Sequence, residues 1–232
     1  MIVLGFLCII LLGGLLLSLP VSSASGETTP FSDALFTATS ATCVTGLVVV
    51  NTATHWSLFG QSIILCLIQI GGLGFMSIAA MLSLLLRRSI SFSERRNVME
   101  SLNLLEYDKV SRMLKYILYG TAAFEGAGAV ILAARFIPDL GFFRGLWTDL
   151  FTSVSAFCNA GFDLMGVQTP FSSMTAYADD LVVTLTICCL IFLGGLGFLV
   201  WADLAGFRKF SKLSVFSKVV LLTSLLLILL GH

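Results

Sequence analysis

The chain has 232 residues, of which 57% are hydrophobic and only 11% are charged, and its mean hydropathy is +1.01. Soluble domains carry about 25% charged residues, so this composition is typical of a multi-pass membrane protein. The formal net charge is zero, which argues against a partner as acidic as a nucleic acid.

Five apolar segments are each long enough to cross a hydrocarbon core of roughly 30 Å. They are residues 2–19, 58–86, 113–137, 181–207 and 213–230. The first also resembles the core of a signal peptide, but no basic residue precedes it and it exceeds the usual length of roughly 7–15 residues. We therefore interpret all five as spanning helices and expect an all-α, polytopic membrane protein.

The basic residues are concentrated in two connections, residues 87–115 and 208–218, whereas the other connections are acidic around residues 27–33 and 163–180. Cytoplasmic connections of membrane proteins are enriched in Lys and Arg. The pattern therefore predicts a cytoplasmic amino terminus, with the acidic connections on the outer side.

One outer segment occurs twice. SDALFTATSATCVTG at residues 32–46 aligns with WTDLFTSVSAFCNAG at residues 147–161, and GGLGF follows at residues 71–75 and again at 194–198. Each copy reads as a spanning helix, an outer segment of small residues and a second spanning helix. Two spans per copy predict copies related by an axis along the membrane normal.

The repeat divides the chain into four parts. We expect a first helix–loop–helix repeat at residues 1–87 and a cytoplasmic linker at residues 88–111. A second repeat follows at residues 112–208, and residues 209–232 match the first helix of an incomplete third repeat. The linker is amphipathic and mixed in charge, which suits either a solvated helix or a docking surface for a regulatory subunit.

The outer segment of the first copy combines a helix signal with a helix-breaking one. Pro30 precedes it, Ser32 can cap a helix over residues 31–42, and Asp33 favours its first turn. Residues 43–47 include the β-branched Val44 and Thr45 and the glycine Gly46, and they favour an extended loop. Such a re-entrant loop can point carbonyl oxygens at a cation, because irregular backbone at membrane depth must be buried or line a cavity. A polar external loop is the alternative; the duplication and the missing charge favour a pore loop.

FSDALFTATSATCVTGLVVVNT and FGQSIILCLIQIGGLGFM resemble the membrane subunit of the Ktr potassium uptake systems, within the Trk/Ktr/HKT superfamily. The resemblance implies a K⁺-channel-like fold with four helix–pore loop–helix repeats around a central pore, in a bacterial cell membrane. It also implies K⁺ uptake, Na⁺ stimulation, a homodimer and a cytosolic ring of nucleotide-binding regulatory subunits. This chain departs from the family pattern because it contains two repeats and one further helix.

The resemblance also assigns an ion selectivity filter that binds K⁺ through backbone carbonyls. The first candidate filter segment consists of Thr42, Cys43, Val44, Thr45 and Gly46, and the second of Phe157, Cys158, Asn159, Ala160 and Gly161. No bound cofactor is expected, since K⁺ and Na⁺ are transported ions. The glycines of both GGLGF motifs suit close helix packing or a hinge.

Two acidic residues lie near this expected pathway. Glu125 is an acid deep within a spanning segment, where a carboxylate is costly and often functional. It either borders the cation pathway or bonds to a neighbouring helix. Asp163 follows Gly161 at the outer mouth, where it either attracts cations or is simply solvated.

Two other classes of function compete with a K⁺ transporter. A solute carrier with discontinuous helices would bind a small molecule near the midplane, but both candidate segments lie in the outer half. An intramembrane enzyme would need a nucleophile–base pair or metal ligands within the spans, and the sequence offers neither there. We therefore expect a transport protein and not an enzyme.

Overall fold

The computed structural model describes residues 2–74, 110–167, 169–206 and 213–230. Across these ranges the regular elements are helices, and an isolated bridge joins Ser23 to Trp56. The predicted all-α fold class is confirmed. Most of the predicted linker at residues 88–111, and residues 75–86 of the predicted span 58–86, lie outside the described residues.

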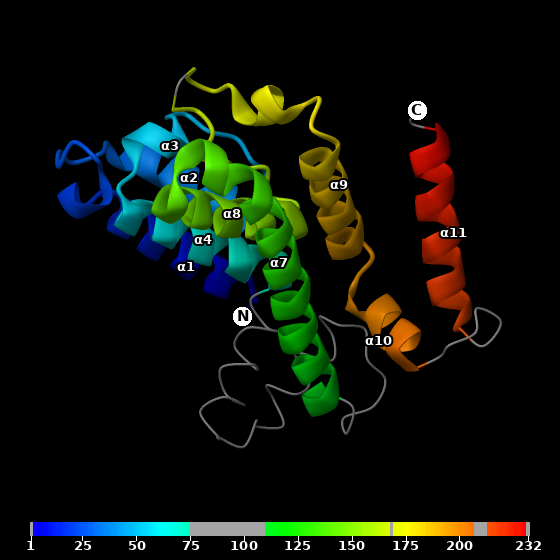
Figure 1. Ribbon diagram of the computed structural model, residues 1–232. Helices are drawn as coiled ribbons and strands as arrows, with labels where there is room; N and C mark the ends of the chain where they lie inside the picture. Colours follow the sequence, from blue (N-terminus) through cyan, green and yellow to red (C-terminus); the bar gives the residue numbers. More distant parts are fainter. Residues whose placement is uncertain (1, 75–109, 168, 207–212, 231–232) are drawn as a thin grey trace.

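The first unit consists of two long helices around a shorter one. α1 (Ile2–Leu17) and α4 (Leu58–Leu73) flank α2 (Phe31–Thr42), and the short α3 (Thr52–His55) lies in the connection between α2 and α4 (Figure 1). The Ser57 side chain accepts a hydrogen bond from the Gly60 amide and so caps the start of α4.

The second unit repeats this plan, with a longer first helix and a longer middle helix. α7 (Val110–Leu140) precedes α8 (Phe142–Phe157), a 3₁₀ turn at Ser173–Tyr177 and α9 (Leu181–Gly195). α10 (Phe198–Gly206) continues from α9, and α11 (Val215–Leu230) stands at the far edge of the molecule (Figure 1). Asp180 caps α9 by accepting hydrogen bonds from the Val182 and Val183 amides.

The apolar helices differ in length from the predicted spanning segments. Tyr116–Leu140 is long and apolar enough to cross a membrane by itself, and the shorter apolar helices are Val3–Leu17, Leu58–Leu73, Leu181–Gly195 and Val215–Leu230. The predicted span 181–207 is two helices, because the backbone at Gly197 has a φ of +84°. Gly74 has a φ of +79° at the equivalent place, directly after the end of α4.

Equivalent glycines let the helices of each unit approach closely. A Cβ at Gly13 would lie 2.8 Å from Leu67 Cδ1 and 3.3 Å from Ala38 Cβ, and a Cβ at Gly128 would lie 2.7 Å from Leu190 Cδ1 and 2.5 Å from Ser153 Oγ. Gly13, Ala38 and Leu67 occupy the same places in the first copy as Gly128, Ser153 and Leu190 in the second. The duplication in sequence is therefore a duplication of packing.

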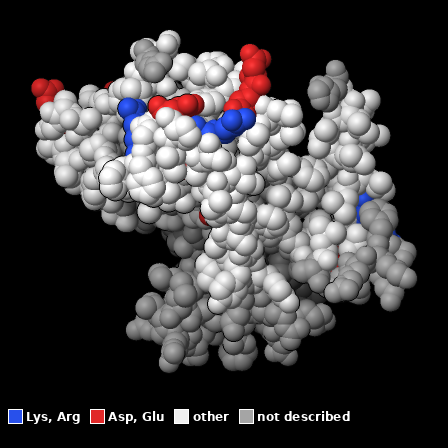
Figure 2. Space-filling view, viewed as in Figure 1, with Lys and Arg blue, Asp and Glu red and all other residues white. Residues whose placement is uncertain are grey.

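One hydrophobic core joins the two units. It contains Ile64 and Ile68 of α4 together with Phe151 and Phe157 of α8, all 3% exposed or less. The connections that follow α2 and α8 also meet, since the Asn51 side chain donates a hydrogen bond to the Gly166 carbonyl. Figure 2 shows Lys, Arg, Asp and Glu gathered along the upper edge of the molecule, above a surface on which few charged side chains are visible.

Candidate functional site

α2 and α8 end in the same hydrogen-bonded motif. After α2, the Thr45 amide donates to the Ser40 carbonyl at 2.9 Å and the Val44 amide to Ala41 at 3.3 Å; after α8, the Ala160 amide donates to Ser155 at 2.7 Å and the Asn159 amide to Ala156 at 3.0 Å. This is the Schellman arrangement, in which a left-handed residue ends a helix and satisfies its last carbonyls. Here Val44 and Asn159 take that place, with φ values of 57° and 58°.

Two details of the predicted loop are corrected. Residues 43–47 do not leave the helix in an extended conformation, because Cys43 is still helical (φ −86°, ψ 0°) and Val44 is left-handed. The Schellman bonds impose this turn. Pro30, not Ser32, occupies the N-cap position of α2, and the Ser32 hydroxyl donates to Asp33 Oδ1 at 3.1 Å. The predicted bounds of the helix at residues 31–42 agree with α2.

The two candidate filter segments approach each other through their glycines. Gly46 and Gly161 have φ values of +72° and +74°. A Cβ at Gly46 would lie 2.5 Å from the Ala160 carbonyl oxygen and 3.3 Å from Gly161 Cα, whereas a Cβ at Gly161 would lie 3.6 Å from Gly46 Cα. Both the conformation and the contact at Gly46 therefore require glycine.

Glycines of the second helices support the two segments from behind. A Cβ at Gly71 would overlap the Thr42 carbonyl oxygen, and a Cβ at Gly194 would overlap that of Phe157. Across the two units, a Cβ at Gly72 would lie 2.5 Å from Cys158 Sγ. The GGLGF motifs thus contact the backbone of the candidate filter itself.

The surroundings of the segments are polar but almost uncharged. Hydroxyl side chains of α2 and α8 are buried here: Thr37, Ser40, Thr42, Thr152, Ser153 and Ser155. Asp149 of α8 is the exception, since it is fully buried and neither carboxylate oxygen has a hydrogen-bond partner among the described residues. Sequence reasoning missed Asp149, although a carboxylate inside an uncharged segment is a usable signal.

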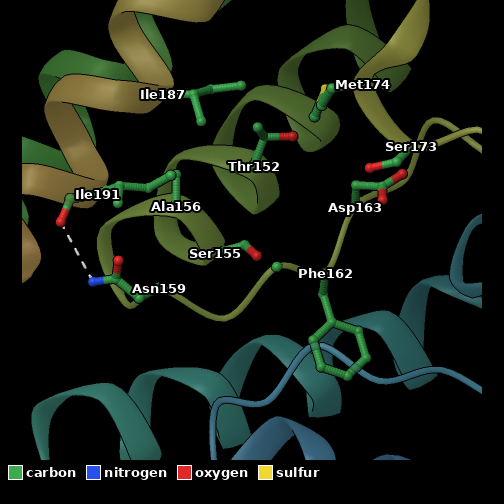
Figure 3. A pocket seen from close by; sticks show the side chains of 11 residues that line it. Thr152, Ser155, Ala156, Asn159, Phe162, Asp163, Ser173, Met174, Ile187 and Ile191 are labelled. Carbon is green, nitrogen blue, oxygen red and sulfur yellow. Dashed lines mark hydrogen bonds between the residues drawn. The ribbon is translucent and has the colours of Figure 1, made fainter. Parts of the chain in front are cut away.

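A cavity of about 270 Å³ lies beside the second candidate filter segment, between α8, α9 and the 3₁₀ turn. Figure 3 shows Asn159 at one end of it, with Asp163 and Ser173 toward the other. Asn159 Nδ2 donates to the Ile191 carbonyl at 3.5 Å, and Asp163 Oδ1 accepts from the Met165 amide at 2.9 Å. Asp163 is half-buried and separated from Gly161 by one residue.

Glu125 lies behind the second candidate filter segment and is only 8% exposed. Gln69 Nε2 donates to its two carboxylate oxygens at 3.0 and 3.2 Å, and Cys158 Sγ donates to Gln69 Oε1 at 3.7 Å. The contact with Gln69 is a bond to a neighbouring helix, one of the two roles considered for Glu125. Sequence reasoning missed Gln69, whose signal is a long amide within the apolar run LCLIQIGG.

Comparison with known families gives one match over most of the chain. Residues 10–229 match TrkH, described as a cation transport protein. The resemblance to the Trk/Ktr superfamily is thereby confirmed.

Curated relatives are bacterial ion-uptake proteins. The chain is 47% identical over 225 residues to the potassium/sodium uptake protein NtpJ of Enterococcus hirae, covering 97% of this chain and 49% of that protein. It is 41% identical to the Ktr system potassium uptake protein B of Bacillus subtilis and 39% identical to that of Vibrio alginolyticus. These matches cover 96% and 99% of this chain but 48% and 50% of the relatives. The chain thus spans about half the length of these relatives, and it belongs to the TrkH family of cation transport proteins.

Proposed function

We propose that this chain supplies two of the walls of a K⁺-selective pore, and that the transporter containing it takes up K⁺ across a bacterial cell membrane. The close approach of Gly46 to Gly161 carries the proposal. Two segments with the same left-handed positions meet there through their backbones, so carbonyl oxygens rather than side chains are available to a passing ion. Carbonyl oxygens can replace the hydration shell of K⁺.

The carboxyl ends of two helices add a second favourable interaction with a cation. α2 and α8 both terminate at the candidate filter segments, and the carboxyl end of a helix carries roughly half a negative charge. Two such ends near one point attract a cation without offering it a full carboxylate. A site of this kind stabilises a dehydrated monovalent ion and still allows it to leave.

The same proposal assigns roles to the remaining candidate residues. Residues 42–46 and 157–161 form the filter, and Asp163 raises the cation concentration at its outer mouth. Residues 1–87 and 112–208 are two equivalent units, and residues 209–232 contain the first helix of a third. K⁺ is the main transported ion, with Na⁺ as a competing or stimulating ion; the NtpJ relative is named for both.

Orientation and assembly belong to the proposal as well. We place the amino terminus and the basic connections in the cytoplasm; Arg95, Arg96 and Lys109 lie outside the described residues. A homodimer bound to a cytosolic nucleotide-binding ring follows from the Ktr resemblance. Relatives named as parts of a Ktr system support a partner subunit of some kind.

The decisive test is Gly46→Ser in the full-length transporter, expressed in a cell lacking its own K⁺ uptake. A side chain at a left-handed position costs roughly 1–2 kcal/mol, and this one would also meet the Ala160 carbonyl. We expect weaker Rb⁺ uptake and a K⁺-over-Na⁺ preference reduced by about tenfold, equivalent to roughly 1.4 kcal/mol. Uptake is normalised to folded protein.

Gly26→Ser is the matched control for this test. Gly26 has a φ of +75°, but a Cβ there would meet nothing within 4 Å. It therefore imposes the same backbone strain away from the filter. If Gly46→Ser and Gly26→Ser leave the K⁺ preference equally intact, residues 42–46 are not a filter.

A further inference from the structure

The α4 helix of the first unit contacts the second unit through two glutamines. Gln61 and Gln69 lie about two turns apart, in the stretch of α4 that also carries the buried Ile64 and Ile68. An amide side chain within an apolar helix is costly unless both its donor and its acceptor are satisfied. Each glutamine finds at least one partner in the second unit: Trp147 of α8 for Gln61, and Glu125 and Cys158 for Gln69.

Gln61 binds the beginning of α8. The Trp147 indole Nε1 donates to Gln61 Oε1 at 2.7 Å, and Gln61 Nε2 donates to the Trp56 carbonyl at 3.1 Å. Gln61 is only 8% exposed, so these bonds are shielded from water. The first turns of α8 are thereby fixed against α4.

Gln69 binds the end of α8. Its Nε2 donates to both Glu125 carboxylate oxygens, which leaves its Oε1 directed at Cys158. Cys158 is the C-cap of α8 and the second residue of the second candidate filter segment. Glu125 is itself tied to α8, because the Ser153 hydroxyl donates to its backbone carbonyl at 2.7 Å.

The second unit has no equivalent of this arrangement. Its residues at the places of Gln61 and Gln69 are Thr184 and Phe192, and the first unit has Ile10 at the place of Glu125. Thr184 hydrogen-bonds locally, to the Tyr177 and Ala178 carbonyls. The repeated architecture is therefore built without these glutamines, and their presence calls for a role particular to this interface.

We propose that Gln61 and Gln69, with Glu125 orienting Gln69, are positioning residues that hold α8 at both ends and so set the ion preference of the second candidate filter segment. The inference rests on the proposed function. A site that discriminates between ions tolerates displacements of only about 0.5 Å. Apolar packing alone allows small sliding of one helix on another, whereas directional hydrogen bonds at two points do not.

The test measures Rb⁺ uptake with Na⁺ competition in the full-length transporter carrying Gln69→Leu or Gln61→Leu. We expect the K⁺-over-Na⁺ preference to fall by about threefold to tenfold, the range that loss of one hydrogen bond produces. The maximal rate per folded protein should change less than the preference. Ser62→Ala is the matched control, because Ser62 is also on α4 but donates only to the Leu58 carbonyl of its own helix.

A charge swap separates positioning from general packing. Gln69→Glu alone sets two carboxylates against each other and should lower the preference. Gln69→Glu combined with Glu125→Gln restores one amide–carboxylate pair and leaves an acceptor for Cys158, so the preference should recover. If Gln69→Leu does not fold, the single and double charge variants test the inference instead. A double variant whose K⁺-over-Na⁺ preference does not recover overturns the inference.

The outcomes also distinguish this inference from the proposed function. A parent transporter without K⁺-selective uptake would refute the proposed function. A selective parent in which Gly46→Ser lowers the preference, while Gln69→Leu and Gln61→Leu leave it unchanged, would refute only the positioning role.

Discussion

Val44 occupies a backbone conformation that β-branched residues rarely adopt. Its left-handed φ of 57° costs roughly 1–2 kcal/mol, and the equivalent Asn159 reaches the same φ at less cost. The conformation persists because the Val44 amide is bonded to Ala41 and its side chain packs beside Gly71. Local strain of this kind is concentrated at functional sites, which agrees with a filter at this place.

Gly71 and Gly194 give a prediction at the scale of single atoms. In both Gly71→Ala and Gly194→Ala, the new methyl group would overlap a carbonyl oxygen of the candidate filter. A backbone carbonyl cannot rotate aside as a flexible side chain can. The overpacking should therefore lower the free energy of unfolding by about 1–3 kcal/mol. We expect less folded transporter and an altered K⁺-over-Na⁺ preference in the fraction that folds, measured by size-exclusion chromatography and Rb⁺ uptake.

Gly126→Ala is the control for this prediction. Gly126 is also helical, within α7, but a Cβ there would meet nothing within 4 Å. Normal preference in the folded fraction of Gly71→Ala would mean that this glycine serves helix packing alone.

At the scale of single residues, the sequence predicts which glycines occupy equivalent places in the two segments. It does not predict which side chains of distant helices bond to each other. The duplicated spacing identifies Gly46 and Gly161 without coordinates. The bond from Gln69 to Glu125 joins residues 56 positions apart. No local pattern in one sequence specifies which helix will face another, so such a bond needs the fold.

At the scale of elements, α2 agrees with its predicted bounds because its signals are local: Pro30 precedes its first residue, and poor helix formers follow Thr42. The fourth span was predicted as one helix, since residues 181–207 are largely apolar and their one charged residue, Asp203, lies near the end. The observed break depends on the positive φ of Gly197. Glycine within an apolar helix is tolerated for several reasons, so composition alone does not reveal a break.

The break between α9 and α10 can be tested with two neighbouring glycines in this chain. Gly197→Ala places a side chain at a φ of +84°, although no atom lies within 4 Å of the new Cβ. We expect the free energy of unfolding to fall by roughly 1–2 kcal/mol because of the strained backbone conformation alone. The measurement is thermal stability of the purified chain in detergent.

Gly195→Ala, two residues earlier, should have the opposite effect. Gly195 is helical and a Cβ there also meets nothing within 4 Å. Alanine within a helix stabilises the folded protein by roughly 0.5–1 kcal/mol relative to glycine. Equal stabilities of the two variants would contradict a defined break at Gly197.

At the scale of the whole molecule, the two units differ in what covers them. Ile64 and Ile68 of α4 are fully buried in the core that both units share, whereas Ile191, at the equivalent place to Ile68, is 42% exposed and lines the open cavity. The candidate filter therefore has walls on two sides.

We accordingly predict that the purified 232-residue chain supports no selective Rb⁺ uptake in liposomes, whereas the full-length transporter does. Two walls cannot enclose an ion and replace its hydration shell. Chemical cross-linking of the reconstituted sample establishes its oligomeric state. Robust K⁺-selective uptake by a monomeric chain would contradict both this prediction and the pore geometry proposed above.

The two glutamines of α4 have a consequence for biosynthesis. A chain is made from its amino terminus at about 5–20 residues per second, so α4 enters the bilayer before Trp147, Glu125 and Cys158 exist. Gln61 and Gln69 then lack their partners in the second unit, at a cost of about 1–3 kcal/mol for each unsatisfied group. Insertion of α7 and α8 removes this cost, so the nascent first unit should be recognised by membrane chaperones and proteases until the second unit has docked on it.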